Sequence, residues 1–213
     1  MFYRTLTGLS MSILIGVLAA GVSAVMALIL GICAATLGKK VDSAISFAID
    51  TVMGIPHILL LILISYAMGK GLKGVIAGVA LTHWTSLARL IRGEVMQLRE
   101  SEYIQIAGKL GLGKWEIAKK HIVPHVLPQF IVGLVLLFPH AILHESSITF
   151  LGFGLSTEQP AIGVILSESM RYLIMGKWWL AVFPGMMLVL TVVLFEKGGT
   201  ALRQLLDPGS VHK

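Results

Sequence analysis

Residues 89–128 read RLIRGEVMQLRESEYIQIAGKLGLGKWEIAKKHIVPHVLP, and they form the one long polar stretch in a chain of 213 residues. Between residues 89 and 120 this stretch carries seven Lys or Arg and four Glu. Tyr103, Ala107 and Leu110 recur at spacings of three and four, which predicts one face of a helix. Gly111 and Gly113 then interrupt the pattern. The stretch is therefore predicted to be an ordered helix–turn–helix rather than a charged loop.

The rest of the chain is apolar. Hydrophobic residues make up 56% of the sequence, only 13% are charged, and the mean hydropathy is +0.87. A soluble globular protein carries about twice that share of charge, so the composition indicates a membrane protein. The net charge of +6 does not indicate nucleic-acid binding, because basic residues at the ends of membrane helices explain it. The single cysteine, Cys33, excludes a disulfide framework.

The sequence predicts an all-α fold: one transmembrane helical domain covering residues 1–213. Five apolar segments are long enough to cross, or nearly cross, a hydrocarbon core of about 30 Å. Pro56 is expected to kink the second of them, and the third is short because it contains His83 and Trp84. A further amphipathic helix is expected over 162–173. The predicted spans cover residues 12–37, 44–68, 75–90, 126–151 and 180–195.

Two further patterns predict how the helices pack. Asp42 and Asp50 are expected to pair with cations of the polar stretch. The first span carries a stripe of small residues, which is typical of close helix packing in membranes; its members are Gly16, Ala20, Gly21, Ala24 and Ala27.

The distribution of basic residues predicts the orientation. Twelve Lys or Arg fall on the side of the polar stretch and five on the other side. Cytoplasmic segments carry the excess of positive charge. The polar stretch and the C-terminus are therefore expected in the cytoplasm, and the N-terminus outside it.

The polar stretch and its flanks resemble a known family. The order Tyr103 to Ala107, then Gly111, then His121 to Pro124 resembles the cytoplasmic "EAA loop" of membrane subunits of ATP-binding-cassette (ABC) importers. The segments 82–92, 149–155 and 183–185, with the Leu206-Asp207-Pro208 ending, are similar to the dipeptide/oligopeptide/nickel permease family. The name-giving Glu-Ala-Ala is Gln105-Ile106-Ala107 here.

This resemblance implies a type I ABC importer permease fold in the cytoplasmic (inner) membrane. It implies a homologous second permease subunit, two ATPase subunits that hold the ATP, and an extracytoplasmic substrate-binding protein. Residues 93–125 would form the loop that couples to the ATPase. Family members usually have six spans, so the chain is expected to begin after the first one. The residues that the resemblance assigns to coupling are Tyr103, Gln105, Ala107, Leu110 and Gly111.

Ionisable residues inside the fourth span are candidates for the cargo path. His140 and His144 stand one helical turn apart, with Glu145 adjacent. Two imidazoles at this spacing are candidate ligands for nickel or another divalent metal, or they hydrogen-bond across helices. The nickel permeases within the family resemble the chain at both histidines. His83 and Trp84 are instead expected to anchor the helix at the membrane interface.

Nothing in the sequence predicts an enzyme. The glycines of 108–114 fit the start of a phosphate-binding loop, but the eighth position is Trp115 where that loop needs Ser or Thr. The chain is therefore expected to hold no cofactor of its own. The predicted function is a permease subunit of an ABC importer, carrying nickel, a metal chelate or a di- or oligopeptide. The alternative is a secondary transporter or channel that needs no ATPase.

Overall fold

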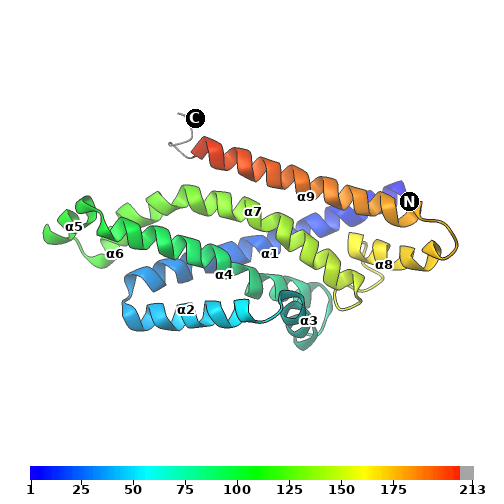
Figure 1. Ribbon diagram of the computed structural model, residues 1–213, viewed down its shortest axis with the longest axis horizontal. Coiled ribbons are helices and arrows are strands. Elements are labelled where there is room, and N and C mark those ends of the chain that lie inside the picture. The colour runs from blue at the N-terminus through cyan, green and yellow to red at the C-terminus, as the bar shows by residue number, and fades with distance from the viewer. Residues whose placement is uncertain (207–213) are drawn as a thin grey trace.

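The computed structural model describes residues 1–206, apart from the side chain of Lys114, and Asp207 and Pro208 of the family ending lie outside this range. All the regular structure among the described residues is helical (Figure 1). The elements are α1 (Phe2–Thr36), α2 (Lys39–Gly54), α3 (His57–Ala67), α4 (Gly71–Glu100), α5 (Glu102–Lys109), α6 (Lys114–Ile117), the π-helical turn η1 (Ala118–Ile122), α7 (Val123–Phe150), α8 (Ile162–Leu173) and α9 (Trp179–Leu206). The helix expected over 162–173 is confirmed as α8.

Four helices of the described chain, namely α1, α4, α7 and α9, are long and apolar enough to cross a membrane. The pair α2 and α3 forms a fifth candidate, bent by 100° at its break. The expected kink at Pro56 is thus a sharp corner. Proline cannot continue a helix, and the residue before it avoids the helical region; Ile55 is extended, with φ −93° and ψ 137°.

The helix α4 corrects the predicted third span, which was expected to be short and to end at residue 90. It runs for 30 residues, Gly71–Glu100, or about 45 Å at 1.5 Å per residue. The first part of the polar stretch is therefore the continuation of a membrane helix. Figure 1 shows α5 and α6 at one end of the molecule and α8 and the N-terminus at the other.

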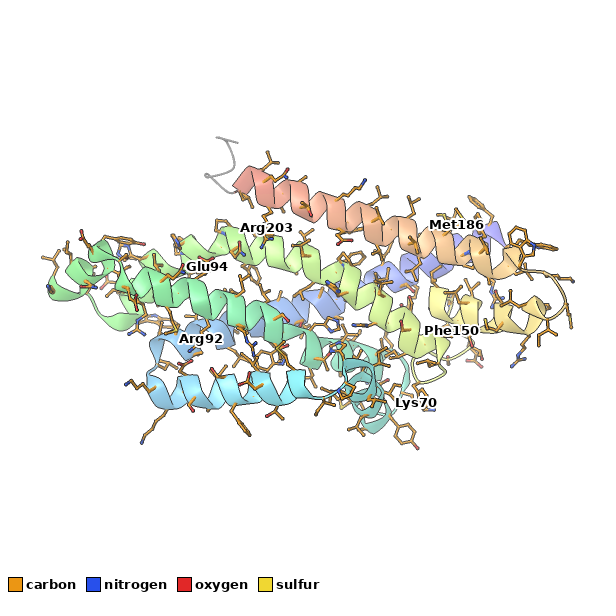
Figure 2. All side chains as sticks on the ribbon, in the orientation of Figure 1. Lys70, Arg92, Glu94, Phe150, Met186 and Arg203 are labelled. Carbon is orange, nitrogen blue, oxygen red and sulfur yellow. The ribbon has the colours of Figure 1, made fainter. Side chains whose placement is uncertain are left out.

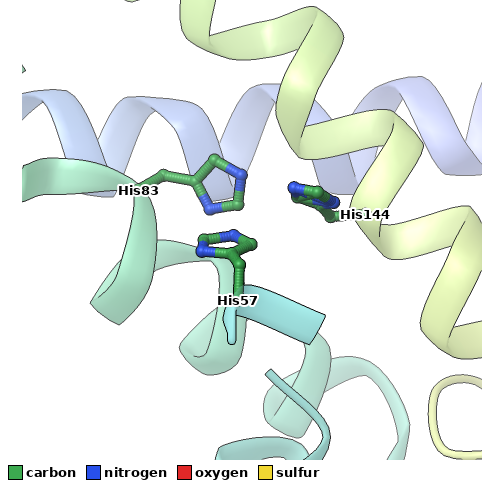
Figure 3. Close-up of side chains that lie close together, drawn as sticks. All are labelled: His57, His83 and His144. Atoms are coloured by element: carbon green, nitrogen blue, oxygen red, sulfur yellow. The ribbon is translucent and has the colours of Figure 1, made fainter. Parts of the chain in front are cut away.

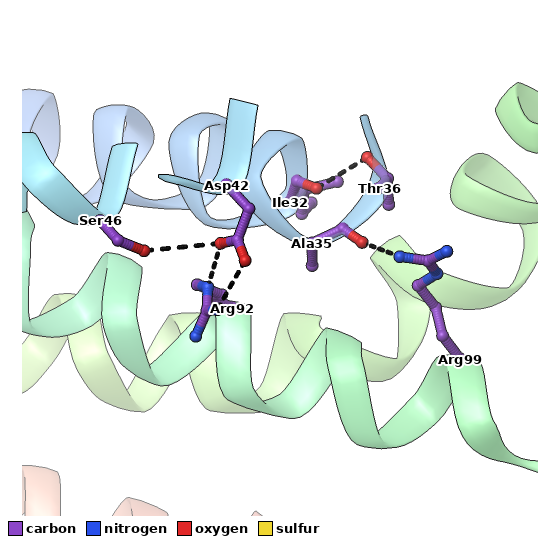
Figure 4. A network of polar contacts seen from close by, with 7 residues as sticks. All are labelled: Ile32, Ala35, Thr36, Asp42, Ser46, Arg92 and Arg99. Carbon is purple, nitrogen blue, oxygen red and sulfur yellow. Dashed lines mark hydrogen bonds and ion pairs between the residues drawn. The ribbon is translucent and has the colours of Figure 1, made fainter. Parts of the chain in front are cut away.

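Arginines of α4 pair with groups on α1 and α2, as Figure 4 shows for Arg92 and Arg99. Arg92 forms a two-pronged ion pair with Asp42 of α2, one bond being 2.8 Å long. Arg89 reaches Asp50 at 2.6 Å, and Arg99 donates to the Ala35 carbonyl at the end of α1. The expected pairing of Asp42 and Asp50 with cations of the polar stretch is confirmed. The exposed Arg89–Asp50 pair contributes at most about 1 kcal/mol, so its main effect is to fix where α2 lies.

Small residues let α1 approach α4 closely. A Cβ atom at Gly31 would lie 2.8 Å from the Ala88 carbonyl oxygen and 3.0 Å from Ile91. Of the predicted small-residue stripe, Gly16, Ala20, Ala24 and Ala27 are buried. Gly21 is the exception, since a Cβ there would meet nothing within 4 Å.

Gly31→Val should therefore destabilise the α1–α4 contact, whereas Gly21→Ala should not. Overpacking a tight contact typically costs about 1–3 kcal/mol, while Gly→Ala in an open helical position gains up to about 1 kcal/mol. Thermal unfolding of the purified protein should show a lower midpoint for Gly31→Val alone. Equal midpoints for the two variants would contradict this packing.

The helix α9 leaves much of its apolar surface uncovered. It packs against α7 and α8, yet Met186, Val189, Leu190 and Leu194 are each more than half exposed. Figure 2 shows Met186 near one end of α9 and Arg203 near the other. An apolar surface of this kind suits lipid or another membrane subunit.

Candidate functional site

A cavity of about 600 Å³ lies where the α2–α3 corner meets α4 and α7. Exposed residues at its edge, including Met53, Pro56 and Ser86, leave it open at the surface. No acidic residue is among the described residues that line it. The lining consists of Met53, Gly54, Ile55, Pro56, His57, Thr82, His83, Thr85, Ser86, Leu137, His140 and His144.

Three of these histidines converge, one from each neighbouring element (Figure 3). His57 begins α3, His83 lies in α4 and His144 in α7. Their ring centroids are 4.5–5.0 Å apart. One ring nitrogen of each lies within 4.8 Å of the other two. Imidazoles held together in this way are a recognised ligand set for transition metals.

His83 has a fixed orientation, because its Nδ1 atom lies 3.0 Å from the Val79 carbonyl oxygen and 3.1 Å from the Thr82 hydroxyl. The side chain is only 8% exposed. The expectation that His83 and Trp84 anchor the helix at the interface is therefore wrong. Because α4 continues to Glu100, both residues lie well inside the helix and are buried in the bundle.

The two histidines that the sequence predicted as candidate metal ligands, His140 and His144, lie in different environments. His140 and His144 both line the cavity, as their one-turn spacing requires. His144 is half-buried and joins His57 and His83, whereas His140 is exposed and is not part of the converging group. Sequence reasoning missed His57 and His83 as candidate ligands, since no spacing rule groups residues 57, 83 and 144. Their shared signal was only that each histidine interrupts an apolar segment.

Glu145 lies away from the cavity lining. It is fully buried and accepts hydrogen bonds from Ser146 at 3.1 Å and Thr149 at 3.0 Å. The Ser12 hydroxyl of α1 also bonds this carboxyl and accepts the Ile162 N–H of α8 at 3.2 Å. Glu145 therefore joins three helices, which is a structural arrangement rather than one that faces an open path.

The residues assigned to coupling occupy α5 and the turn after it. Tyr103 is 47% exposed and Leu110 is 79% exposed. Gln105 is exposed and donates to the Glu100 carbonyl at 3.0 Å. Ala107 differs from the others, since it is buried at 7% exposure. It therefore packs within the chain and is not available on the surface of α5.

Gly111 adopts φ +90°, a left-handed conformation that favours glycine, and ends α5. The Gly108–Lys114 segment is thus the end of α5, a turn and the first residue of α6, and it is preceded by helix rather than strand. Two exposed apolar residues nearby were not predicted as contacts, namely Ile106 (54%) and Trp115 (82%).

The arrangement of the long helices, the bent pair and the short helices at one end is shared with ABC importer permeases of known structure. A solved structure of the MetNI methionine ABC transporter in an inward-facing conformation superposes with a TM-score of 0.78 at 16% identity, covering 97% of this chain and 98% of that chain. An amino acid ABC transporter with histidines gives a TM-score of 0.69 at 18% identity, covering 95% of this chain and 94% of that chain. These likenesses establish the fold.

The family follows from the sequence. Residues 27–210 match the binding-protein-dependent transport system inner membrane component, and the chain belongs to this family of multi-pass inner-membrane transport proteins. It is a permease subunit rather than an enzyme.

Curated relatives are similar along most of the chain. The dipeptide transport system permease protein DppC of Bacillus subtilis is 32% identical over 97% of this chain and 65% of its own length. The oligopeptide transport system permease protein OppC of the same organism is 32% identical over 97% of this chain and 68% of its own length. The chain thus spans about two thirds of the length of these relatives.

Proposed function

We propose that the chain is the membrane subunit of an importer driven by ATP that separate subunits hydrolyse. The observation that carries this proposal is the exposed surface of α5, the turn after it and the start of α6. Tyr103, Ile106, Leu110 and Trp115 expose large apolar groups at the end of the bundle where the basic polar stretch lies. Exposed aromatic and aliphatic anchors on a short ordered helix suit docking into a groove of a soluble partner.

The proposed complex contains two ATPase subunits, a homologous second permease subunit and an extracytoplasmic binding protein. The uncovered apolar surface of α9 and the open side of the histidine cavity leave room for a second membrane subunit. Closure of the ATPase subunits on ATP would move the docked α5 helices together. The bundles would then rock as rigid bodies and switch the cavity from one side of the membrane to the other.

The proposed cargo is a di- or oligopeptide, nickel or a metal chelate. The relatives DppC and OppC are named as permeases of dipeptide and oligopeptide transport systems. The cavity volume of about 600 Å³ falls within the range of small-ligand pockets. The three converging histidines favour a cargo that contains a metal.

The direct test is uptake by proteoliposomes that contain the assembled complex and the binding protein. Uptake should require ATP on the ATPase side and should stop when the ATPase subunits are omitted. Dipeptide, nickel and a nickel chelate should be compared in parallel. Uptake by the permease alone, driven by an ion gradient, would indicate a secondary transporter instead.

Orientation gives a separate prediction. Lys109 of α5 and Lys177, before α9, are both exposed and are expected on opposite sides of the membrane. In a Cys33→Ser background, an impermeant thiol reagent added to intact cells should label Lys177→Cys and spare Lys109→Cys. Both positions should react once the cells are permeabilised. Labelling of position 109 alone in intact cells would reverse the proposed orientation.

A further inference from the structure

Two imidazole nitrogens in the cavity are buried without a hydrogen-bond partner among the described residues. They are the Nε2 atoms of His57 and His83. A buried polar atom that makes no hydrogen bond costs about 1–3 kcal/mol, so such an atom calls for an explanation. Both residues belong to the converging group with His144.

The hydrogen bond of His83 determines which nitrogen is available. The Val79 carbonyl oxygen can only accept, so the Nδ1 atom of His83 must carry the proton for the 3.0 Å contact to be a hydrogen bond. The Nε2 atom then presents a lone pair to the cavity. A metal-bound imidazole is oriented in just this way, with its second nitrogen bonded to a carbonyl or carboxylate.

We infer that His57, His83 and His144 form a binding site for a borderline divalent transition metal, of the class of Ni²⁺, Cu²⁺ or Zn²⁺, carried as cargo. That the metal is cargo rests on the proposed function. That a metal binds here rests on the structure alone. Two nitrogens bound to one ion by bonds of about 2.1 Å lie at most about 4.2 Å apart. One ring nitrogen of each histidine lies within 4.8 Å of those of the other two, so small ring rotations bring three nitrogens onto one ion.

The site suits a metal in transit rather than a permanent structural ion. Three imidazoles leave a coordination position open, whereas structural zinc sites are closed by four protein ligands. The cavity opens at the surface, and His140 lies on its wall as a further donor. No described residue of the lining is acidic, so the chain supplies no negative charge to the ion. A chelator with carboxylates would supply that charge, and a bare ion would not.

His57 also makes the site sensitive to conformation. It is the first residue of α3, directly after the 100° corner, whereas His83 and His144 lie within long helices. A change in the angle between α2 and α3 would withdraw one of the three ligands. The rocking motion of the permease could thereby release the ion.

The site can be tested with radioactive Ni²⁺ and the full chain purified with its partner subunits. Equilibrium dialysis should show one site per chain that is weakened at least about 100-fold in each of His57→Ala, His83→Ala and His144→Ala, since loss of even an outer partner of a metal ligand costs 10–100-fold. His125→Ala, which changes an exposed histidine outside this cavity, should bind Ni²⁺ normally. Normal binding by all three cavity variants, or loss only when His140 and His144 are changed, would overturn the site.

A second measurement avoids the risk that a variant fails to fold. X-ray absorption of Ni²⁺ bound to the wild-type complex should show scattering from three imidazole rings, and a spectrum with one ring or none would overturn the site. Parallel titrations with Ni²⁺ alone and with a Ni²⁺–carboxylate chelate identify which form is taken up. If the metal binds but uptake does not need ATP, the proposed function fails and the site stands. If ATP-driven peptide uptake proceeds in a complex that binds no metal, the site fails and the function stands.

Discussion

Gly111→Asp should abolish ATP-driven uptake and the stimulation of ATP hydrolysis by cargo, while the subunit still inserts and folds. Within the chain an aspartate side chain fits, because a Cβ at Gly111 would meet no atom within 4 Å. The φ of +90° is strained for most residues, but Asp and Asn tolerate left-handed conformations better than others. The expected loss therefore comes from the partner, since burying an unpaired charge in a docking surface costs several kcal/mol.

Two controls separate the charge from the added bulk. Gly111→Asn adds a side chain of the same size at the same φ, so it should retain part of the uptake that Gly111→Asp loses. Gly176→Asp introduces the same charge at an exposed glycine before α9, where φ is also positive at +77° and a Cβ also meets nothing within 4 Å, and should not affect uptake. Uptake per inserted complex is the measurement. Wild-type uptake by Gly111→Asp would exclude α5 as the docking element.

The helical fold could be predicted because its signals are local. Apolar segments, Pro56 and the paired glycines each act on nearby residues of the chain. The structure contains a helix for each predicted span and the predicted turn at the glycines, and at Pro56 it has a 100° corner where the sequence predicted a kink. The sequence pattern does not predict the full length of α4, because the first charged residues after the apolar segment indicate the end of the helix. Arg89, Arg92 and Arg99 in fact extend the helix, since α1 and α2 provide an ion-pair or carbonyl partner for each of them.

The candidate metal site was less predictable, because its members come from three segments. Sequence spacing can find two residues on one helix face, as it did for His140 and His144. It cannot find a ring from the start of α3 and another from the middle of α4, which are brought together only by the corner at Pro56. The sharpness of that corner depends on how α2 and α3 pack on α4, and hence on tertiary contacts.

Glu145 is a second residue whose environment could not be predicted from its position in the sequence. A carboxyl next to His144 in sequence was expected to share its environment, but adjacent residues of a helix point about 100° apart. His144 therefore faces the cavity, while Glu145 faces α1 and the start of α8. The two alternatives for Glu145, cargo path and structural junction, make different predictions for its isosteric and apolar variants.

Glu145→Leu should destabilise the protein strongly, by about 2–4 kcal/mol, because it leaves three buried hydroxyls without their shared acceptor. Each buried donor that loses its partner costs about 1–3 kcal/mol, and the serine and threonine hydroxyls recover part of this by turning to carbonyls of the preceding helical turn. The variant should yield much less assembled complex and a lower unfolding midpoint, measured on purified membranes.

Glu145→Gln is the matched control, since it has nearly the same shape and keeps a polar partner for both hydroxyl groups, which bond different oxygens of the carboxylate. Its amide oxygen can accept from one of Ser146 and Thr149, and its NH2 group can donate to the hydroxyl oxygen of the other. It should assemble and unfold almost as the wild type does, and uptake per assembled complex should be unchanged for every cargo. If Glu145→Gln instead assembled normally but lost uptake of a metal-containing cargo alone, Glu145 would act in the cargo path. That result would require the junction between α1, α7 and α8 to open during transport, because in this structure the carboxyl is fully buried.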